Sequence, residues 1–192
     1  AFLTPLAAVF SAVWAVPLFA FAGAMGAVAV VYAVARVGRT LPLTTLILAG
    51  VAVGVFLSSV TSFVMLYSGS DLRHIIFWLL GGFSLANWQE VGIILPYVVV
   101  GAAVIMVFSR SLNVMQLDEE QAQQLGVEVE RVKLILIAAA TLITAAAVSF
   151  AGTIGFVGII IPHAVRLLWG PDHRFLLPLS VLSGGVFLIL AD

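Results

Sequence analysis

Residues 2–35 form one apolar run that holds no charged side chain. A single helix over this run would reach roughly 50 Å at about 1.5 Å per residue, whereas the hydrocarbon core of a bilayer is about 30 Å thick. The Val16–Pro17 step is the natural break, because the residue before a proline is pushed out of helical geometry. The run therefore predicts a spanning helix that ends by Val13 and a complete one over 18–35, which Arg36 and Arg39 close.

The composition fits a membrane protein and no other broad class. Hydrophobic residues make up 63% of the chain and charged residues 9%, whereas about 25% of a soluble domain is charged. The chain has no cysteine, which excludes disulfides, thiolate metal sites and cysteine nucleophiles. A net charge of −1 without a basic cluster indicates no nucleic-acid partner.

Further apolar segments long enough to span a bilayer are expected at 45–67, 91–108 (despite Pro96), 134–150, 154–169 and 175–190. With the opening stub, the pattern predicts an all-α fold, a polytopic membrane helical bundle of about six to seven spans. Because the chain starts and stops within apolar runs, we expect a single transmembrane domain over 1–192 that is truncated at both ends.

A shorter apolar piece lies between two of these spans. Asp71 is a good N-cap for a helix over 72–80, which is too short to cross a bilayer and which Gly81 and Gly82 end. Trp78 and Trp88 suit a membrane–water interface. We therefore expect residues 71–90 to be re-entrant or interfacial.

The basic residues support one orientation. If the end of the 18–35 helix is cytoplasmic, alternation of the spans places Arg73 outside and the other seven of the 8 Lys and Arg inside: Arg36, Arg39, Arg110, Arg131, Lys133, Arg166 and Arg174. This distribution follows the positive-inside rule.

Residues 110–133 form the one long polar stretch, RSLNVMQLDEEQAQQLGVEVERVK. Asp118, Glu119 and Glu120 suit the first turn of a helix, and Gly126 follows Leu125 as a C-cap glycine would. We expect a helix of about two turns here and a second helix start near Val129. A solvated loop and a handle for a partner protein fit this stretch equally well.

The stretch 152–178, GTIGFVGIIIPHAVRLLWGPDHRFLLP, combines apolar and helix-breaking residues. Gly152, Gly155 and Gly158 recur at every third position, a spacing that favours close helix packing in a bilayer. Pro162 removes a backbone N–H and frees the carbonyl of Gly158. The cytoplasmic end carries the polar residues Arg166, Asp172, His173 and Arg174.

The motifs of common membrane enzymes are missing from the sequence. It holds no HExxH, Walker or GxSxG motif, so it predicts no catalytic residue and no enzyme activity of its own. Ser149 with His163 as a protease pair, and His163 or Met106 as a haem ligand, are weaker readings than ordinary packing. We expect no metal site and no cofactor. The spans also hold almost no ionisable side chain, which suggests that the energy for any transport comes from elsewhere.

Four segments together resemble a known family. IGFVGIIIPHAVRLLWGPDHRFLLPLSVLSGGVFLILAD at 154–192 resembles the signature region of the permease subunits of type II ABC importers for iron–siderophores, haem and cobalamin. The segments LILAGVAVG, DLRHIIFWLLGGFSLANW and LNVMQLDEEQAQQLGVEVERVK, at 46–54, 71–88 and 112–133, are similar in the same order to the helix after the gate loop, the short external helix and the coupling loop of that family.

The resemblance implies an architecture and partners. Family subunits have ten spanning helices, so the chain would hold the end of the third through the ninth. The expected partners are a second permease subunit (most simply in a homodimer), two cytoplasmic ATPase subunits that hydrolyse ATP, an extracytoplasmic substrate-binding protein and the lipid bilayer. The expected location is the cytoplasmic (inner) membrane of a prokaryote, with several passes.

The resemblance also assigns roles to residues. The coupling helix that sits in a groove of the ATPase would comprise 118–126, with Leu117, Asp118, Glu119, Glu120, Leu125 and Gly126 as its contact residues. Leu43 and Thr44 fall in the cytoplasmic gate loop, where Leu43 replaces a hydroxyl residue of the family. Helices 45–67 and 72–80 would line the pathway. The signature residues would serve packing or the cytoplasmic end: Gly152, Gly155, Gly158, Pro162, His163, Arg166, Asp172, His173 and Arg174. Capping of helices explains the polar ones equally well.

The implied function is passage of an iron–siderophore complex, or a related metal chelate, across the membrane. Haem and cobalamin are the alternatives within the family, and ferric siderophore is favoured only because it is the most frequent substrate. A membrane scaffold or a passive channel without ATPase coupling is the alternative from another class.

Overall fold

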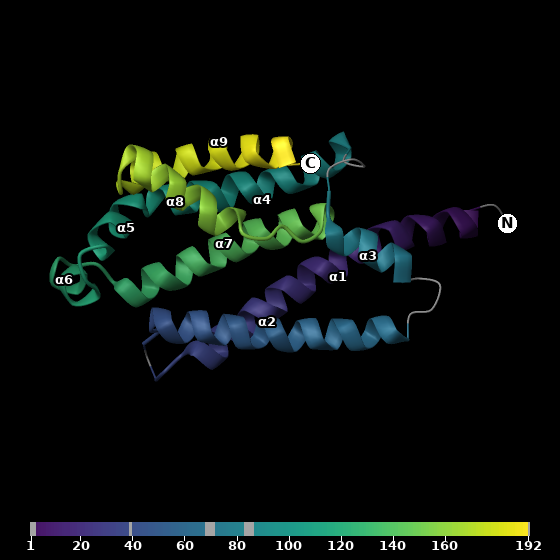
Figure 1. Cartoon of the computed structure of the whole chain (residues 1–192), viewed down its shortest axis with the longest axis horizontal. Helices are drawn as coiled ribbons and strands as arrows, with labels where there is room; N and C mark the ends of the chain where they lie inside the picture. The colour runs from purple at the N-terminus through teal and green to yellow at the C-terminus, as the bar shows by residue number, and fades with distance from the viewer. Residues whose placement is uncertain (1–2, 39, 68–71, 83–86, 192) are drawn as a thin grey trace. The chain divides into compact units, whose positions relative to one another are not determined.

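The computed structural model describes residues 3–38, 40–67, 72–82 and 87–191, and within them it is helical, with one isolated bridge between Val37 and Thr40 (Figure 1). The helices are α1 (Leu3–Ala35), α2 (Leu43–Leu66), α3 (Leu72–Leu80), α4 (Trp88–Val107), α5 (Ser109–Met115), α6 (Glu119–Gln124), α7 (Val129–Ala151), α8 (Val157–Trp169) and α9 (His173–Ala191). The predicted all-α fold is confirmed. The chain divides into two compact units, residues 1–81 with 144–153, and residues 82–143 with 154–192.

Five helices in the described part are long and apolar enough to cross a membrane: 15–35 of α1, α2, α4, α7 and α9. Together they make the chain a multi-pass membrane protein. Few side chains in these spans are buried within the chain, as expected for helices surrounded by lipid or by other helices. The span expected over 154–169 is too long: α8 begins at Val157 and has 13 residues. It is therefore about 20 Å long, shorter than the roughly 30 Å hydrocarbon core.

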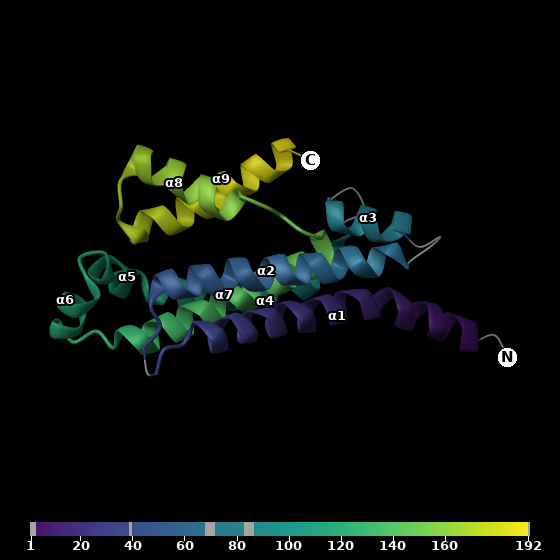
Figure 2. The same ribbon diagram turned by 60° about the horizontal axis from the view of Figure 1, so that its bottom comes forward.

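The break expected at Val16–Pro17 is wrong. Helix α1 runs through Pro17 without interruption (Figure 2). A proline removes one backbone hydrogen bond, and ending the helix there would leave several more polar backbone groups without partners in lipid. Continuing the helix is therefore the smaller cost.

Within the first unit, α1 and α2 pack side by side and are joined by a tight turn. Val37 and Thr40 exchange backbone hydrogen bonds of 3.0 and 3.1 Å across this turn. Arg39 lies outside the described residues. Pro42 is the last extended residue (φ −65°, ψ 133°), so α2 begins at Leu43 and not at the expected Thr45.

The short helix α3 has the predicted bounds, and the expected cap Asp71 lies outside the described residues. Gly81 and Gly82 end α3 with φ of +69° and +148°. Gly152, which follows α7 with φ +74°, lies against this turn: a Cβ on it would lie 2.4 Å from the carbonyl oxygen of Trp78. The Thr153 hydroxyl donates a hydrogen bond to the Leu79 carbonyl. These contacts fasten the end of α7 to α3.

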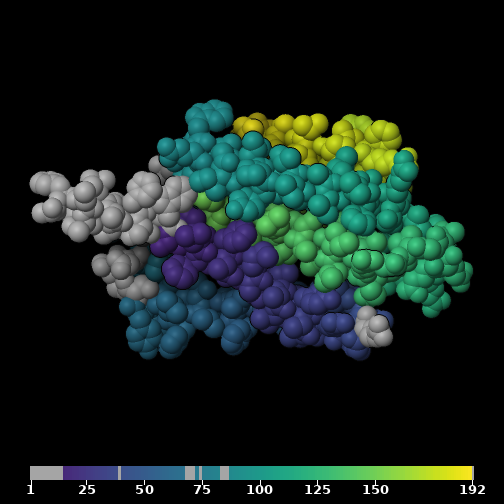
Figure 3. All heavy atoms as spheres, turned by 180° about the vertical axis from the view of Figure 1, so that it is seen from behind, coloured from purple at the N-terminus to yellow at the C-terminus, as the bar shows by residue number. Residues whose placement is uncertain are grey.

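In the second unit, α4 begins at Trp88, earlier than the expected Val91, because Asn87 caps it by accepting from the N–H groups of Gln89 and Glu90. Pro96 lies inside the helix, as expected. Gly101 of α4 is buried against Ile143 and Ala139 of α7, with no room for a Cβ. Figure 3 shows the side chains of α4, in teal, lying along the green side chains of α7.

Helices α8 and α9 form a hairpin in the same unit (Figure 1). Ile161, Val165 and Leu176 form its buried core, and Val157 and Leu179 pack against them. The hairpin turns at 170–172, so α9 begins at His173, two residues earlier than the expected start at 175, and the turn places Asp172 and His173 at one end of the helix pair.

Candidate functional site

The polar stretch between α4 and α7 is a folded piece made of α5, α6 and the first turn of α7. Sequence reasoning missed α5, because within this stretch it expected helices only from about Asp118 and from near Val129. Ser109, the first residue of α5, is buried. This piece is the candidate functional site, since it carries the predicted coupling residues.

Helix α6 is capped at both ends by residues that adjoin it in the sequence. The Asp118 carboxylate accepts a 2.7 Å hydrogen bond from the N–H of Glu119. At the other end the N–H of Gly126 bonds the carbonyl of Gln123, and the N–H of Val127 bonds that of Ala122. These two bonds form a Schellman motif, in which Gly126 takes the left-handed conformation (φ +84°). The predicted positions of the acidic turn and of the C-cap glycine are confirmed.

One side of α6 is fixed and the other is exposed. Ala122 and, at the start of α7, Val129 are fully buried. Leu117 precedes α6 in the sequence and Leu125 follows it, and each is 66% exposed. Glu120 is exposed as well. The segment therefore offers two large apolar side chains and an acidic one on a rigid support.

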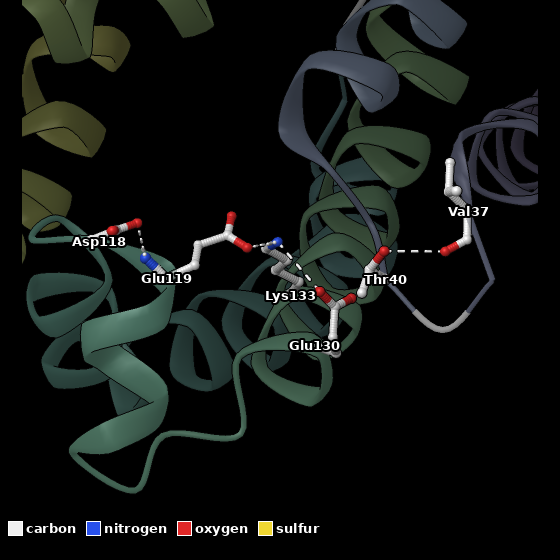
Figure 4. A network of polar contacts seen from close by, with 6 residues as sticks. All are labelled: Val37, Thr40, Asp118, Glu119, Glu130 and Lys133. Atoms are coloured by element: carbon white, nitrogen blue, oxygen red, sulfur yellow. Dashed lines mark hydrogen bonds and ion pairs between the residues drawn. The ribbon is translucent and has the colours of Figure 1, made fainter.

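Lys133 sits between two carboxylates (Figure 4). Its ammonium lies 2.7 Å from Glu119 Oε2 and 3.5 Å from Glu130 Oε1, and its side chain is only 6% exposed. A buried ammonium requires such partners, because desolvation of an unpaired charge is costly. Glu119 is thus engaged within the chain, which the sequence did not indicate.

The α8–α9 turn is held by two side-chain amides, those of Asn113 in α5 and of Gln116, the C-cap residue of α5. Asn113 Nδ2 donates to Asp172 Oδ1 over 2.6 Å, and Asn113 Oδ1 accepts from the backbone N–H of His173 over 2.8 Å. Gln116 Nε2 donates to the Pro171 carbonyl over 2.9 Å and lies 2.6 Å from His173 Nδ1. Three consecutive residues of the turn region, 171–173, are thereby held against the C-terminal end of α5.

The partners fix the amide orientations. Asp172 and the Pro171 carbonyl only accept, so each must face an amide nitrogen, and the His173 N–H must face an oxygen. His173 Nδ1 then lies between the Asn113 oxygen, 2.8 Å away, and the Gln116 nitrogen. Each tautomer of the ring makes one of these two bonds.

Asp172 is also the N-cap of α9, because its Oδ1 accepts the N–H of Arg174 over 3.0 Å. This backbone hydrogen bond, followed by the Asn113 amide, lowers the pKa of the Asp172 carboxyl below 3.8. The turn therefore carries a negative charge that two donors, the Arg174 N–H of α9 and the Asn113 amide of α5, stabilise.

The other predicted signature residues are more dispersed. Gly155 was expected in a helix but lies in the α7–α8 connection, and a Cβ on Gly155 or Gly158 would meet nothing within 4 Å. Of the three glycines, only Gly152 therefore lies in a close contact within the chain, and packing through Gly155 and Gly158 stays a prediction. Pro162, His163 and Arg166 lie in α8, and Arg174 lies at the start of α9. The side chains of His163, Arg166 and Arg174 are exposed.

The predicted gate residues Leu43 and Thr44 do not lie in a loop. They are the first two residues of α2, and both are exposed. Within the part of the chain that the structure describes, no group of three potential metal-binding side chains comes together.

Comparison with known proteins decides the family. The profile of the FecCD transport family matches residues 1–192. The chain belongs to this family. A FecCD relative, the cobalamin import system permease protein BtuC of Halobacterium salinarum, is 53% identical over 173 residues, which cover 90% of this chain and 47% of the relative.

Two other relatives are named as permease proteins of ferric citrate import or transport systems. The Fe(3+)-citrate import system permease protein YfmD of Bacillus subtilis is 38% identical over 91% of this chain and 52% of its own length. The Fe(3+) dicitrate transport system permease protein FecC of Escherichia coli is 37% identical over 77% of this chain and 44% of its own. The chain spans about half the length of the curated relatives it matches.

A solved structure has the same fold. It is assigned to the metal-chelate type of ABC transporter, in an inward-facing conformation, and matches with a TM-score of 0.73 and 32% identity. The match covers 78% of this chain and 49% of that structure.

Proposed function

We propose that this chain is the central part of the membrane-spanning subunit of an ATP-driven importer, which passes a bulky metal chelate across the cytoplasmic membrane of a prokaryote. The observation that carries this proposal is α6: a capped helix, rigidly supported, that presents Leu117, Leu125 and Glu120 to the outside. Large exposed apolar side chains on a polar segment are typical of a protein interaction site. Membership of a family whose named relatives are import permeases agrees with it.

The proposed partner of α6 is a cytoplasmic ATPase subunit. Its site would combine an apolar groove for Leu117 and Leu125 with a basic or N–H donor group for Glu120. Gly126 gives the backbone turn that ends the contact, and Asp118 and Glu119 support it from within the chain. ATP is then hydrolysed in that separate subunit, and this chain is not itself an enzyme.

In the proposed mechanism, closure of the ATPase subunits on ATP displaces α6, and α6 moves the helices attached to it so that the pathway opens alternately to either side. Leu43 and Thr44, at the start of α2, are proposed as part of the cytoplasmic gate. A second permease subunit and an extracytoplasmic substrate-binding protein complete the proposed assembly. Arg166 and Arg174 are proposed to support the coupling region or to cap helix ends.

Cobalamin is the substrate to test first. The sequence favoured a ferric siderophore only as the most frequent substrate, whereas 53% identity to a cobalamin permease, against 38% and 37% to the two ferric citrate permeases, favours cobalamin. Uptake of radiolabelled cobalamin and of radiolabelled ferric citrate, by the full-length permease with its ATPase and binding protein, distinguishes the two.

The test of coupling uses α6 itself. The variant Leu117→Ser/Leu125→Ser should lose co-purification of the ATPase subunit, because it removes the apolar contact but leaves Asp118 and Gly126 at the two ends of α6 unchanged. The matched control is Glu128→Ala. Glu128 is an exposed residue of the same polar stretch, and no contact with the ATPase subunit is proposed for it. An unaltered complex with the double variant would contradict the coupling assignment. A wild-type permease that binds no Walker-motif ATPase would favour a scaffold or a passive channel.

A further inference from the structure

The C-terminal end of α5 ties the coupling segment to the α8–α9 hairpin, whereas the Glu119–Lys133 pair ties it to α7. Asn113 of α5 and Gln116, its C-cap residue, lie 59 and 55 positions from their partners Asp172 and Pro171, so the contact is tertiary. Gln116 directly precedes Leu117 and Asp118, with which the coupling segment begins. Any displacement of that segment is therefore applied within two residues of the hydrogen bonds to the hairpin.

Capping of α9 alone does not require this arrangement. The first N–H groups of a helix need acceptors, and Asp172 already serves the N–H of Arg174 from within the turn. The N–H of His173 is served by Asn113, a residue of another helix, although a water or a local side chain would suffice at such an end. The nitrogen of the same Asn113 amide then donates to Asp172, the local cap itself.

The contact is also directional. Asn113 engages one donor and one acceptor of the turn, and Gln116 engages the carbonyl just before them. Three bonds with different directions, from two side chains one helical turn apart, resist both sliding and rotation of the turn against α5. The hairpin and α5 therefore have the contacts of one rigid body.

We propose that Asn113 and Gln116 are positioning residues, which clamp the turn at Pro171–His173 to α5 so that movement of α6 reaches α8 and α9 directly. This proposal rests on the proposed coupling role of α6 and adds a second route for its movement, beside the Glu119–Lys133 pair that joins α6 to α7. The transport cycle then depends on the clamp remaining closed.

A reversible cross-link tests the clamp. The chain has no cysteine, so the pair Asn113→Cys/Asp172→Cys can be introduced into a cysteine-free full-length permease, in complex with its ATPase and binding protein in proteoliposomes. A short bifunctional methanethiosulfonate reagent joins the two thiols, and a reductant releases them. The readout is the amount of radiolabelled cobalamin or ferric citrate imported per ATP hydrolysed.

We expect import per ATP to be low when the two thiols are free and high when they are cross-linked. With free thiols the clamp is broken, and import per ATP should fall about ten-fold while ATP hydrolysis persists, a typical size for a coupling effect. With the cross-link in place, import per ATP should return to near the wild-type value. Asp172→Cys alone, which loses the α9 cap but cannot be bridged, should import the same amount per ATP before and after treatment with the reagent.

Two results would overturn the proposal: wild-type coupling with free thiols, or loss of import on cross-linking that reduction restores. If the cysteine pair fails to fold, Asn113→Ala/Gln116→Ala keeps the Asp172 cap and should show the same uncoupling; wild-type coupling would again refute the clamp. Glu128→Ala is the control and should remain coupled. If the wild-type permease shows no ATP-dependent import, it is the proposed function that fails.

Discussion

Glu119 and Lys133 are 14 positions apart, yet the carboxylate and the ammonium lie 2.7 Å from each other. The pair joins the first turn of α6 to the first turns of α7. The two partners differ in environment, since the side chain of Lys133 is 6% exposed and that of Glu119 is 38% exposed. Removing one partner therefore has a different cost from removing the other.

The first prediction concerns this asymmetry. Glu119→Ala should destabilise the protein by about 1–3 kcal/mol, because it takes from a buried ammonium its nearer carboxylate partner, while the partial exposure of Glu119 moderates the loss. Lys133→Met should cost less, since Glu119 can turn to water and the methionine fills the buried volume. Thermal unfolding of the full-length permease in detergent measures both variants. An equal loss in both would contradict this account of the pair.

The second prediction concerns the end of α6. Gly126→Ala should cost roughly 1–2 kcal/mol, since its φ of +84° disfavours any side chain, although nothing within 4 Å would touch the new methyl group. Gly126→Asn should cost less, because asparagine tolerates the left-handed region. Hydrogen exchange at the N–H groups of Gly126 and Val127 reports opening of the motif. Equal protection in the alanine variant and the wild type would show that the cap is unimportant.

The sequence predicted those features that local chemistry determines. The bounds of α3, the acidic turn at Asp118 and the glycine at 126 follow from capping and turn preferences, and the structure confirms them. Proline was the least reliable signal. Pro17 lies inside a helix instead of breaking it, because the bilayer penalises loss of the remaining hydrogen bonds more strongly than the proline strains the helix.

The tertiary contacts of the site could not be predicted in the same way. Nothing in the local sequence of Asn113 or Gln116 indicates partners at 171–173, and the only signal is two amides three positions apart, on one face of a helix. Glu119 and Glu120 look alike in the sequence, but only Glu119 is opposite Lys133. The regular spacing of Gly152, Gly155 and Gly158 suggested one helix face, whereas the chain leaves α7 before Gly152.

The third prediction separates these glycines. Gly152→Ala should be severely destabilising, by about 2–5 kcal/mol, because a Cβ would clash with the backbone of Trp78 and Gly81 and the residue has a positive φ. Gly155→Ala should be close to neutral, since its surroundings in the chain are open. The yield and thermal stability of the two variants test this contrast. A loss with Gly155→Ala that appears only in the assembled importer would indicate a contact with another subunit.

The fourth prediction concerns the charge on Asp172. The Arg174 N–H and the Asn113 amide lower the pKa of its carboxyl in the folded protein below the value of about 3.8 that it has when unfolded. A lowered pKa means that the ionised group stabilises the fold at pH values above its unfolded pKa, and that this stabilisation is lost as the pH falls through the folded pKa. Asp172→Asn keeps an acceptor for Arg174 but removes the charge. The difference in melting temperature between wild type and Asp172→Asn should therefore be constant at neutral and mildly acidic pH, and should shrink only below a pH of about 4. A difference that already shrinks between pH of about 5 and 7 would assign the effect to another titrating group, and a difference independent of pH throughout would show that the charge does not contribute.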